Sequence, residues 1–489
     1  MEGEDGEETT KRRRLPLSGV FFPMVSPGHM IPLIDIAKLL SRRGVSTTIV
    51  TTAGNDPLAR PAIDRANSDS STTLALPIEL ILLPFPPSST PPPHNRQNLT
   101  NIPPLDYTQL LLALATLLPS LRDLLSRRRP DFFVSDAVFT WTADLALDLG
   151  IPRIVFEGPG AFPLCVHESL SLISVDDETT PIVVGDLPDP IQLARSELSN
   201  IFNYPEMIRA MKDAEEKSFG VVVNTFSGLE PAYAKLYSCR RAGRRVWFIG
   251  PVWQSSNEDD IARADRGGRS HPPDTARLMR WLDEQPVRSV VYVCFGSLCD
   301  FDAAQMRETA AGLEAAGHRF VWAVRDSEGM PTPEGWLPEG FEERVEGRGM
   351  VVRGWVAQVA ILFHAGVGAF VTHCGWNSTL EGVAAGLPMV AWPLMYEQFV
   401  NARLITDVLR VGVGVGKRPG ETVMAGMLAA AVRKVMEEGG EEAEEFRRRA
   451  VKLGALAREA VGVGGSSYED VGRMVEELRA ESSIRFGRQ

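Results

Sequence analysis

The chain has 489 residues, enough for two or three domains, and its 44% hydrophobic and 23% charged residues are ordinary values for a folded protein. Its formal net charge of −12 disfavours general binding to nucleic acids and to anionic membranes, because phosphate groups repel an acidic chain. No apolar run reaches the roughly 18 residues that a membrane span needs. Residues 1–16 are charged, lack the apolar core of a signal peptide and are expected to form a disordered tail.

The five cysteines are odd in number and include no CxxC spacing, so the sequence predicts neither a disulfide framework nor a zinc site. This cysteine usage fits a reducing, cytoplasmic location best. No coiled-coil heptads occur, and their absence favours a monomer.

The N-terminal half alternates between strand and helix patterns. Residues 19–25 form a short apolar run, residues 30–40 have apolar side chains at helical spacing, and residues 45–50 are β-branched. A second unit of this kind spans residues 131–156. Such βαβ units imply a parallel sheet with right-handed crossovers. Proline-rich residues 84–104 are expected to form a surface loop.

The strongest domain boundary is the polar, charged linker at residues 253–273. After it the alternation restarts, with a helix expected at 303–316 and strands at 289–295, 320–324, 350–352, 368–371 and 388–391. The sequence therefore predicts an α/β protein with two doubly wound, Rossmann-like parallel-sheet domains, at 17–252 and 274–465. Open sheets of this type bind ligands beyond the carboxyl ends of their strands, so the functional site is expected in the cleft between the domains.

Two polar residues follow strands of the first domain. His29 lies at the start of a helix and Asp136 directly follows a strand, so both should reach the carboxyl edge of the sheet. A histidine–carboxylate pair can act as a general base, because the carboxylate orients the imidazole and stabilises its cation. Each residue also has a structural explanation, since His29 could bond the backbone and Asp136 could cap a helix.

Unusual residues are densest between Trp355 and Gln398. The segment THCGWNS joins a strand to a helix that starts near Asn377, and the free N–H groups of such a helix start can bind a diphosphate. A carboxylate at Glu381 could accept from ribose hydroxyls. The tryptophans could equally be core residues. The Asp300–Asp302 segment matches a metal-binding DxD motif, but it precedes a helix, so we expect capping instead of a metal site.

The residue pattern resembles the plant family of UDP-dependent glycosyltransferases that act on small molecules. The resemblance lies in the 44 residues from Trp355 to Gln398, with HCGWNS, the LEG that follows and the closing Glu397-Gln398 in register. The segments PGHMIPLIDIAKLL, SDAVFTWTADLA and VYVCFGSL match the family as well.

The resemblance implies a GT-B fold, in which two Rossmann-like domains face each other across a cleft and a final helix at 466–489 packs back on the N-terminal domain. It implies an inverting, metal-independent transfer from a UDP-sugar to a hydroxyl of a small acceptor, without a resident cofactor. His29 would deprotonate the acceptor and Asp136 would hold His29. The implied donor site comprises Ser297, Trp355, Val356, Gln358, His373, Gly375, Trp376, Asn377, Ser378, Glu381, Tyr396, Glu397 and Gln398.

Within this resemblance, Gln398 favours glucose as the transferred sugar. The chain departs from the family pattern at Ala357, where a proline is common, and at residues 157–160, which hold no hydroxyl. The expected acceptor is a plant phenolic such as a flavonoid, in a pocket whose candidate walls are Phe85, Phe162 and Phe202. UDP-rhamnose or UDP-xylose as donor, a C-glycoside as product, and a catalytically idle UDP-sugar binder are the alternatives.

Overall fold

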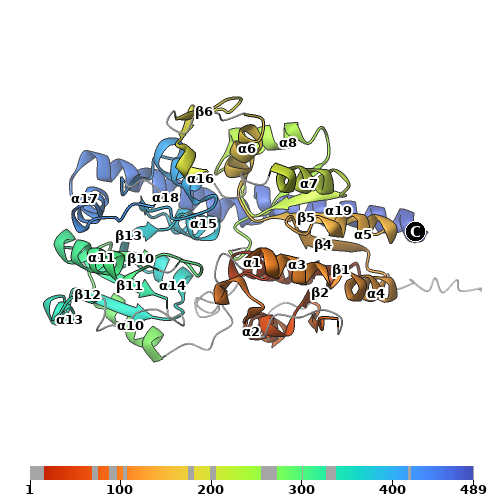
Figure 1. Cartoon of the computed structure of the whole chain (residues 1–489), viewed down its shortest axis with the longest axis horizontal. Helices are drawn as coiled ribbons and strands as arrows, with labels where there is room; N and C mark the ends of the chain where they lie inside the picture. The colour runs from red at the N-terminus through yellow and green to blue at the C-terminus, as the bar shows by residue number, and fades with distance from the viewer. Residues whose placement is uncertain are drawn as a thin grey trace, which may run out of the picture.

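The protein contains two parallel β-sheets, each covered by helices on both faces (Figure 1). The computed structural model describes residues 16–68, 75–86, 96–102, 107–173, 181–198, 205–254, 273–299, 301–325, 337–416 and 420–487. The predicted α/β class with two doubly wound sheets is confirmed.

The first sheet has seven parallel strands in the order β3-β2-β1-β4-β5-β8-β9. Its strands are β1 (Ser18–Phe22), β2 (Ser46–Thr51), β3 (Ile78–Leu82), β4 (Phe132–Asp136), β5 (Arg153–Glu157), β8 (Gly220–Val223) and β9 (Arg245–Phe248). The helices around it are α1 (Pro27–Ser41), α2 (Asp56–Ser68), α3 (Tyr107–Ala115), α4 (Leu118–Arg128), α5 (Trp141–Asp148), α6 (Ala161–Leu170), α7 (Pro205–Glu216) and α8 (Pro231–Arg240). A small antiparallel pair, β6 (Ile182–Val184) and β7 (Ile191–Leu193), lies outside this sheet.

The second sheet has six parallel strands in the order β12-β11-β10-β13-β14-β15. They are β10 (Val290–Cys294), β11 (Arg319–Val324), β12 (Gly349–Arg353), β13 (Val367–Thr372), β14 (Met389–Ala391) and β15 (Gly412–Gly414). The helices are α10 (Pro273–Asp283), α11 (Ala303–Ala316), α13 (Phe341–Arg344), α14 (Gln358–Leu362), α15 (Trp376–Ala385), α16 (Gln398–Arg403), α17 (Ala425–Met436), α18 (Glu441–Val461) and α19 (Ser466–Phe486).

Helix α11 shows how local sequence sets an element's ends. The Asp302 carboxylate accepts a hydrogen bond from the Gln305 N–H at 2.8 Å, which satisfies one free donor of the first turn. At the other end Gly317 adopts a left-handed conformation with φ +82°, which glycine reaches without steric cost. The predicted bounds of this helix and the capping role of Asp302 are confirmed.

Strand register brings the ends of the central strands to one edge of each sheet. In the first sheet Phe22 aligns with Ser135, so the segments after β1 and β4 emerge side by side. In the second sheet Cys294 aligns with Thr372, so the segments after β10 and β13 do the same. Among the predicted site residues, Asp136 ends β4, and His29, Ser297 and His373 follow the other three of these strands.

The last helix, α19, packs against α18 and against β9 of the first sheet. The Asp470 carboxylate accepts from the Phe248 N–H at 2.8 Å, and the Ser482 hydroxyl donates to Asp131. Trp253, assigned to the linker from the sequence, is instead buried and packs edge-on against Phe363 with ring centroids 5.4 Å apart. The folded part therefore extends past residue 252, and residues 255–272 of the expected linker lie outside the described residues.

Over the described ranges, we find no single helix that is both long and apolar enough to cross a membrane. Helices α3 and α4, bent by 43° at their junction, satisfy the length and composition criteria only as a pair.

Candidate active site

His29 and Asp136 form a close pair at the carboxyl edge of the first sheet. The Nδ1 atom of His29 lies 2.7 Å from Oδ2 of Asp136, whose side chain is 1% exposed, whereas that of His29 is 34% exposed. The second Asp136 oxygen accepts from the Val138 N–H at 3.3 Å. One imidazole nitrogen is therefore held by the carboxylate, and the ring remains open to the cleft on its other side.

The surroundings of His29 change its basicity in two directions. Burial by itself lowers the pKa of His29, but the charge and hydrogen bond of Asp136, with smaller contributions from Glu397 and Glu157, raise it above the usual 6.5. A base with a raised pKa takes a proton more readily, and the nearby carboxylate stabilises the resulting cation.

Strand β5 ends beside this pair at Glu157 and Gly158. A Cβ atom on Gly158 would lie 3.3 Å from Cε1 of His29, so the backbone passes close to the ring. Glu157 is 7% exposed, and burial followed by repulsion from Glu215 raises its pKa to about 8. The carboxyl group of Glu157 is therefore mainly neutral at pH 7. Residues 157–160 contain no hydroxyl side chain, as noted from the sequence.

Across the cleft, the turn between β13 and α15 encloses His373. A Cβ atom on Gly296 or on Gly375 would come within 2.6 Å of the His373 ring, so both positions need glycine. Cys374, between His373 and Gly375, has a φ of +64°, a strained conformation for a residue with a side chain. Burial lowers the pKa of His373 to about 4, so the imidazole is neutral at pH 7.

The start of α15 beside His373 has the features of an anion site. The first turn of a helix has free N–H groups and the positive end of the helix dipole. The Nδ1 atom of His373 is buried and has no hydrogen-bond partner among the described residues. The turn can therefore donate hydrogen bonds to a negatively charged group without a fixed cation.

Glu381, Gln358 and Ser378 form one hydrogen-bonded group further along this edge. The Gln358 amide donates to the Glu381 carboxylate at 2.7 Å and lies 3.0 Å from the Ser378 hydroxyl. The Tyr292 hydroxyl donates to the side-chain oxygen of Gln358, Oε1, at 3.3 Å. Val356 is buried and the neighbouring Trp355 is half-buried, immediately before α14. Gln358 and Glu381 were expected to contact the donor separately, whereas the fold joins them by a direct hydrogen bond.

Trp376 and Asn377 connect the two domains. The Trp376 indole is 4% exposed, donates to the Asn224 carbonyl at 2.8 Å and lies where a Cβ on Gly160 would clash at 2.2 Å. The Asn377 amide donates to the Gly28 carbonyl at 2.7 Å, next to His29. The Trp376 side chain therefore packs on the N-terminal domain. Contrary to the expectation, its indole is not open to a sugar, because the domain interface covers it.

The loop before α16 closes this side of the site. Tyr396 has a φ of +54°, and the Gln398 side-chain oxygen accepts from the N–H groups of Leu394 and Met395 at 2.9 and 3.0 Å. Burial raises the pKa of Glu397, and the charge of His29 partly offsets this effect. Glu397 and His29 are thus close enough to affect each other's pKa, although they come from different domains.

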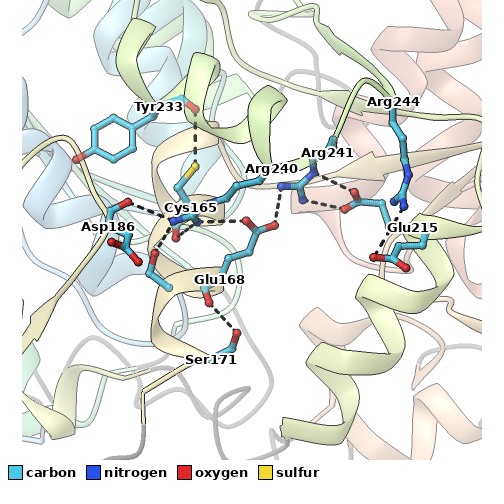
Figure 2. Close-up of polar contacts among 11 residues, drawn as sticks. Cys165, Glu168, Ser171, Asp186, Glu215, Tyr233, Arg240, Arg241 and Arg244 are labelled. Carbon is cyan, nitrogen blue, oxygen red and sulfur yellow. Dashed lines mark hydrogen bonds and ion pairs between the residues drawn. The ribbon is translucent and has the colours of Figure 1, made fainter.

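Helix α6 starts beside the pair and is held by residues that the sequence analysis missed. The Glu230 carboxylate accepts from the first two N–H groups of α6, at 2.8 and 2.6 Å. Figure 2 shows the other anchor, where Arg240 donates to the Cys165 carbonyl at 2.9 Å and Arg241 bridges Glu168 and Glu215. These contacts join α6, α7 and α8, which are distant in sequence, and no local motif indicates them.

The predicted acceptor walls have different outcomes. Phe162 is fully buried and packs edge-on against Tyr233 with ring centroids 4.8 Å apart, so it is a core residue and does not line an open pocket. Phe85 is half-buried against the core of the first domain. Phe202 lies outside the described residues.

Metal-ligating side chains do not cluster in the part of the chain that the structure describes: no group of three or more His, Cys, Asp or Glu residues is placed to hold an ion there.

Comparisons with known proteins match the chain over most of its length. The sequence model of the UDP-glucoronosyl and UDP-glucosyl transferase family matches residues 125–453. A scopoletin glucosyltransferase of Nicotiana tabacum is 42% identical, over 95% of this chain and 98% of that protein. A UDP-glucose flavonoid 3-O-glucosyltransferase of Fragaria ananassa is 40% identical, over 96% of each chain.

Solved structures agree with these sequence matches. Glycyrrhiza uralensis UGT73P12, complexed with glycyrrhetinic acid 3-O-monoglucuronide, superposes with a TM-score of 0.87 at 33% identity, covering 96% of this chain and 97% of that chain. Medicago truncatula UGT71G1, complexed with UDP-glucose, superposes with a TM-score of 0.77 at 26% identity, covering 95% and 98%. Both likenesses extend across the two domains.

Proposed function

This chain belongs to the UDP-glucoronosyl and UDP-glucosyl transferase family and is a GT-B UDP-glycosyltransferase, and we propose that it transfers glucose from UDP-glucose to a hydroxyl of a small plant phenolic such as a flavonoid. The observation that supports the proposal best is the His29–Asp136 pair, 2.7 Å apart, which faces the His373 turn across the cleft.

In the proposed reaction the free nitrogen of His29 takes the proton of the acceptor hydroxyl. The oxygen then attacks the anomeric carbon from the face opposite the leaving UDP, so the C–O bond to UDP breaks as the new glycosidic bond forms with inversion. Asp136 stabilises the imidazolium, whose proton later passes to solvent. Charge that develops on the diphosphate is stabilised by the N-terminus of α15 and by hydrogen bonds from its first turn, so the proposal requires neither a metal nor a resident cofactor.

Two features support glucose and the uridine end of the donor. Gln398 holds the loop next to the proposed sugar position, and the relatives from Nicotiana tabacum and Fragaria ananassa are named glucosyltransferases. The Gln358–Glu381 group presents a fixed carboxylate that can accept from ribose hydroxyls, with Trp355 beside it as the proposed stacking surface for uracil. The cysteines form no disulfide in the described part of the chain, which suits a reducing compartment, so we place the enzyme in the cytoplasm. The lack of coiled-coil heptads in the sequence leads us to expect a monomer.

The test is UDP release by the purified protein with UDP-glucose, a panel of flavonoids and other phenolics, and UDP-rhamnose and UDP-xylose as competing donors. We expect acceptor-dependent release with UDP-glucose and an O-linked product heavier than its acceptor by one hexosyl unit. A preference for another donor, or a C-linked product, would replace this assignment within the family. Tight UDP-glucose binding without release for any acceptor would favour an idle binding protein.

A further inference from the structure

A cavity of about 420 Å³ lies at the N-terminal edge of the second sheet, the end opposite the proposed active site. Its lining includes the turns that lead into β10, β11 and β12, together with residues at the end of α17 and in α18. Helices α13 and α17, which border these turns, lie at the left of Figure 1, away from the N-terminal domain. The proposed reaction uses none of these residues.

Four arginines from separate segments line this cavity. Arg288 precedes β10, Arg319 starts β11, Arg348 precedes β12 and Arg447 lies in α18. The parallel register aligns Val290 with Arg319 and Phe320 with Gly349, so the starts of three adjacent strands place three of these arginines next to each other. The grouping is thus a product of the sheet and not of a local run of basic residues.

The positive charges of the cavity are incompletely compensated. Arg447 pairs with Glu444, and Arg348 donates to the Glu314 carbonyl at 3.2 Å. The guanidinium groups of Arg288 and Arg319 have no hydrogen bond or ion pair with any residue that the structure describes.

Among the described residues that line the cavity, the carboxylates Glu438 and Glu444 oppose four arginines, a surplus of two positive charges when His318 is neutral. The Glu314 carboxylate, outside the lining, interacts electrostatically with Arg348 as well. Burial, followed by the charge of Arg433, lowers the pKa of His318 and so favours its neutral form. The surplus stands out because the whole chain carries a net charge of −12.

The backbone around the cavity leaves room for a ligand. Gly317 and Gly347 have positive φ angles, and a Cβ atom on either would meet nothing within 4 Å. Arg288 itself has a φ of +58°, an uncommon conformation for a residue with a side chain. Arginines that line one cavity repel one another, and an anion bound among them relieves this repulsion. The planar forks of guanidinium groups bind phosphate or carboxylate oxygens in pairs.

We propose that this cavity is a second binding site, which takes a small multivalent anion carrying phosphate or carboxylate groups. Strands of five or six residues separate it from the His373 turn, a distance of about 15 Å or more at ~3.3 Å per residue. A ligand there occupies a site that UDP-glucose bound in the cleft does not reach.

The test is calorimetric titration of the UDP-saturated protein with tripolyphosphate and, separately, with citrate, so that UDP already fills the diphosphate site. Arg288→Gln, Arg319→Gln and the double variant are compared with Arg209→Gln, which removes an exposed arginine from α7 in the N-terminal domain. UDP affinity, measured for each protein, confirms that the variants fold.

We expect one equivalent of anion to bind the wild-type protein, with an affinity that falls as salt rises. Each cavity variant should weaken this affinity at least about tenfold and Arg209→Gln should not, because charge-assisted hydrogen bonds are lost only in the cavity. Tighter binding of tripolyphosphate identifies a phosphate ligand and tighter binding of citrate a carboxylate ligand. No saturable binding of either anion, or equal weakening by Arg209→Gln, would overturn the proposal.

Discussion

The two sheet edges that face each other across the cleft use different chemistry. The edge of the first sheet has titratable groups with shifted pKa values, since that of His29 is raised and that of Glu157 rises to about 8. The edge of the second sheet has a neutral imidazole at His373, whose pKa falls to about 4, beside backbone N–H groups. One edge is suited to moving a proton and the other to binding an anion.

Their backbones differ accordingly. The second edge has left-handed residues with side chains at Cys374 and Tyr396, and glycines packed against His373 at positions 296 and 375. The first edge places His29 at the start of a regular helix, where a single carboxylate orients it. An anion site made of backbone needs an exact turn, whereas a base needs one well-placed partner. Substitutions on the two edges should therefore change different kinetic constants.

The largest effect is expected for His29→Ala. Loss of a general base lowers turnover by about 10²–10⁴-fold, while UDP affinity stays the same because the donor residues lie on the other edge. Steady-state kinetics and UDP titration separate the two quantities. His364→Ala is the matched control, because His364 also pairs with an aspartate, Asp283 at 3.1 Å, but lies outside the cleft. Full activity of His29→Ala would remove the base from the mechanism.

Asp136→Asn should have the next largest effect and should change the pH profile. Only neutral His29 can accept a proton, so the rate rises as pH increases through the pKa of His29, which Asp136 raises. Without this carboxylate the rise moves to lower pH, and the maximal rate falls by at least about tenfold because the base is weaker and less well oriented. A profile of turnover against pH that keeps the wild-type midpoint would show that Asp136 does not tune His29.

The comparison of edges also explains what could be predicted from the sequence. Most of the second edge comes from the continuous segment 355–398, so most of its residues were found together, including the start of α15 and Gln358, which pairs with Glu381. Gly296 and Ser297 come from the separate turn after β10. His29 and Asp136 are more than a hundred residues apart, yet His29 follows β1 and Asp136 ends β4. These positions made both residues candidates, and their roles came from the family resemblance.

Other features depend on tertiary packing and could not be predicted. Strand β15 is three residues long and glycine-rich, and it forms only because β14 supplies its hydrogen bonds. Trp376 was expected at the sugar from the family resemblance, and Phe162 was a candidate for either a pocket wall or the core. The fold buries Phe162 in the core and the Trp376 indole between the domains. The Arg241 cluster that anchors α6 joins three segments with no shared motif.

Glu381→Ala tests the donor edge and should have an intermediate effect. The variant removes the carboxylate that Gln358 holds in place and that is proposed to accept from the ribose hydroxyls. Loss of a hydrogen bond to a charged group costs about 1.5–3 kcal/mol. We expect the KM for UDP-glucose to rise by about tenfold or more, with turnover at saturation nearly unchanged. Glu381→Gln, which keeps the shape and one acceptor oxygen, should lie between this variant and the wild type. A loss of turnover at unchanged KM would place Glu381 outside the donor site.

The smallest effect is expected for Arg403→Gln, which tests how the two edges are held together. Arg403 in α16 pairs at 3.0 Å with Glu197, in a short turn of the N-terminal domain. Trp376 and Asn377 make neutral contacts across the cleft: each donates to a backbone carbonyl, and Asn377 also accepts from the Asn224 amide at 3.4 Å. Because the Arg403 side chain is 35% exposed, the pair should contribute about 0.5 kcal/mol or less. The KM for UDP-glucose should therefore rise by about twofold at most.

Salt should distinguish the two kinds of contact. High ionic strength screens the Arg403–Glu197 pair, so the KM of the wild-type protein for UDP-glucose should approach that of Arg403→Gln as salt increases. In a double-mutant cycle, Glu197→Gln should add nothing to the effect of Arg403→Gln. Asn377→Ala removes a neutral hydrogen bond to the Gly28 carbonyl, so its effect should persist at high salt. If Arg403→Gln and Asn377→Ala respond to salt alike, the ion pair is not a separate link across the cleft, and the neutral contacts beside His29 alone set the distance between base and donor.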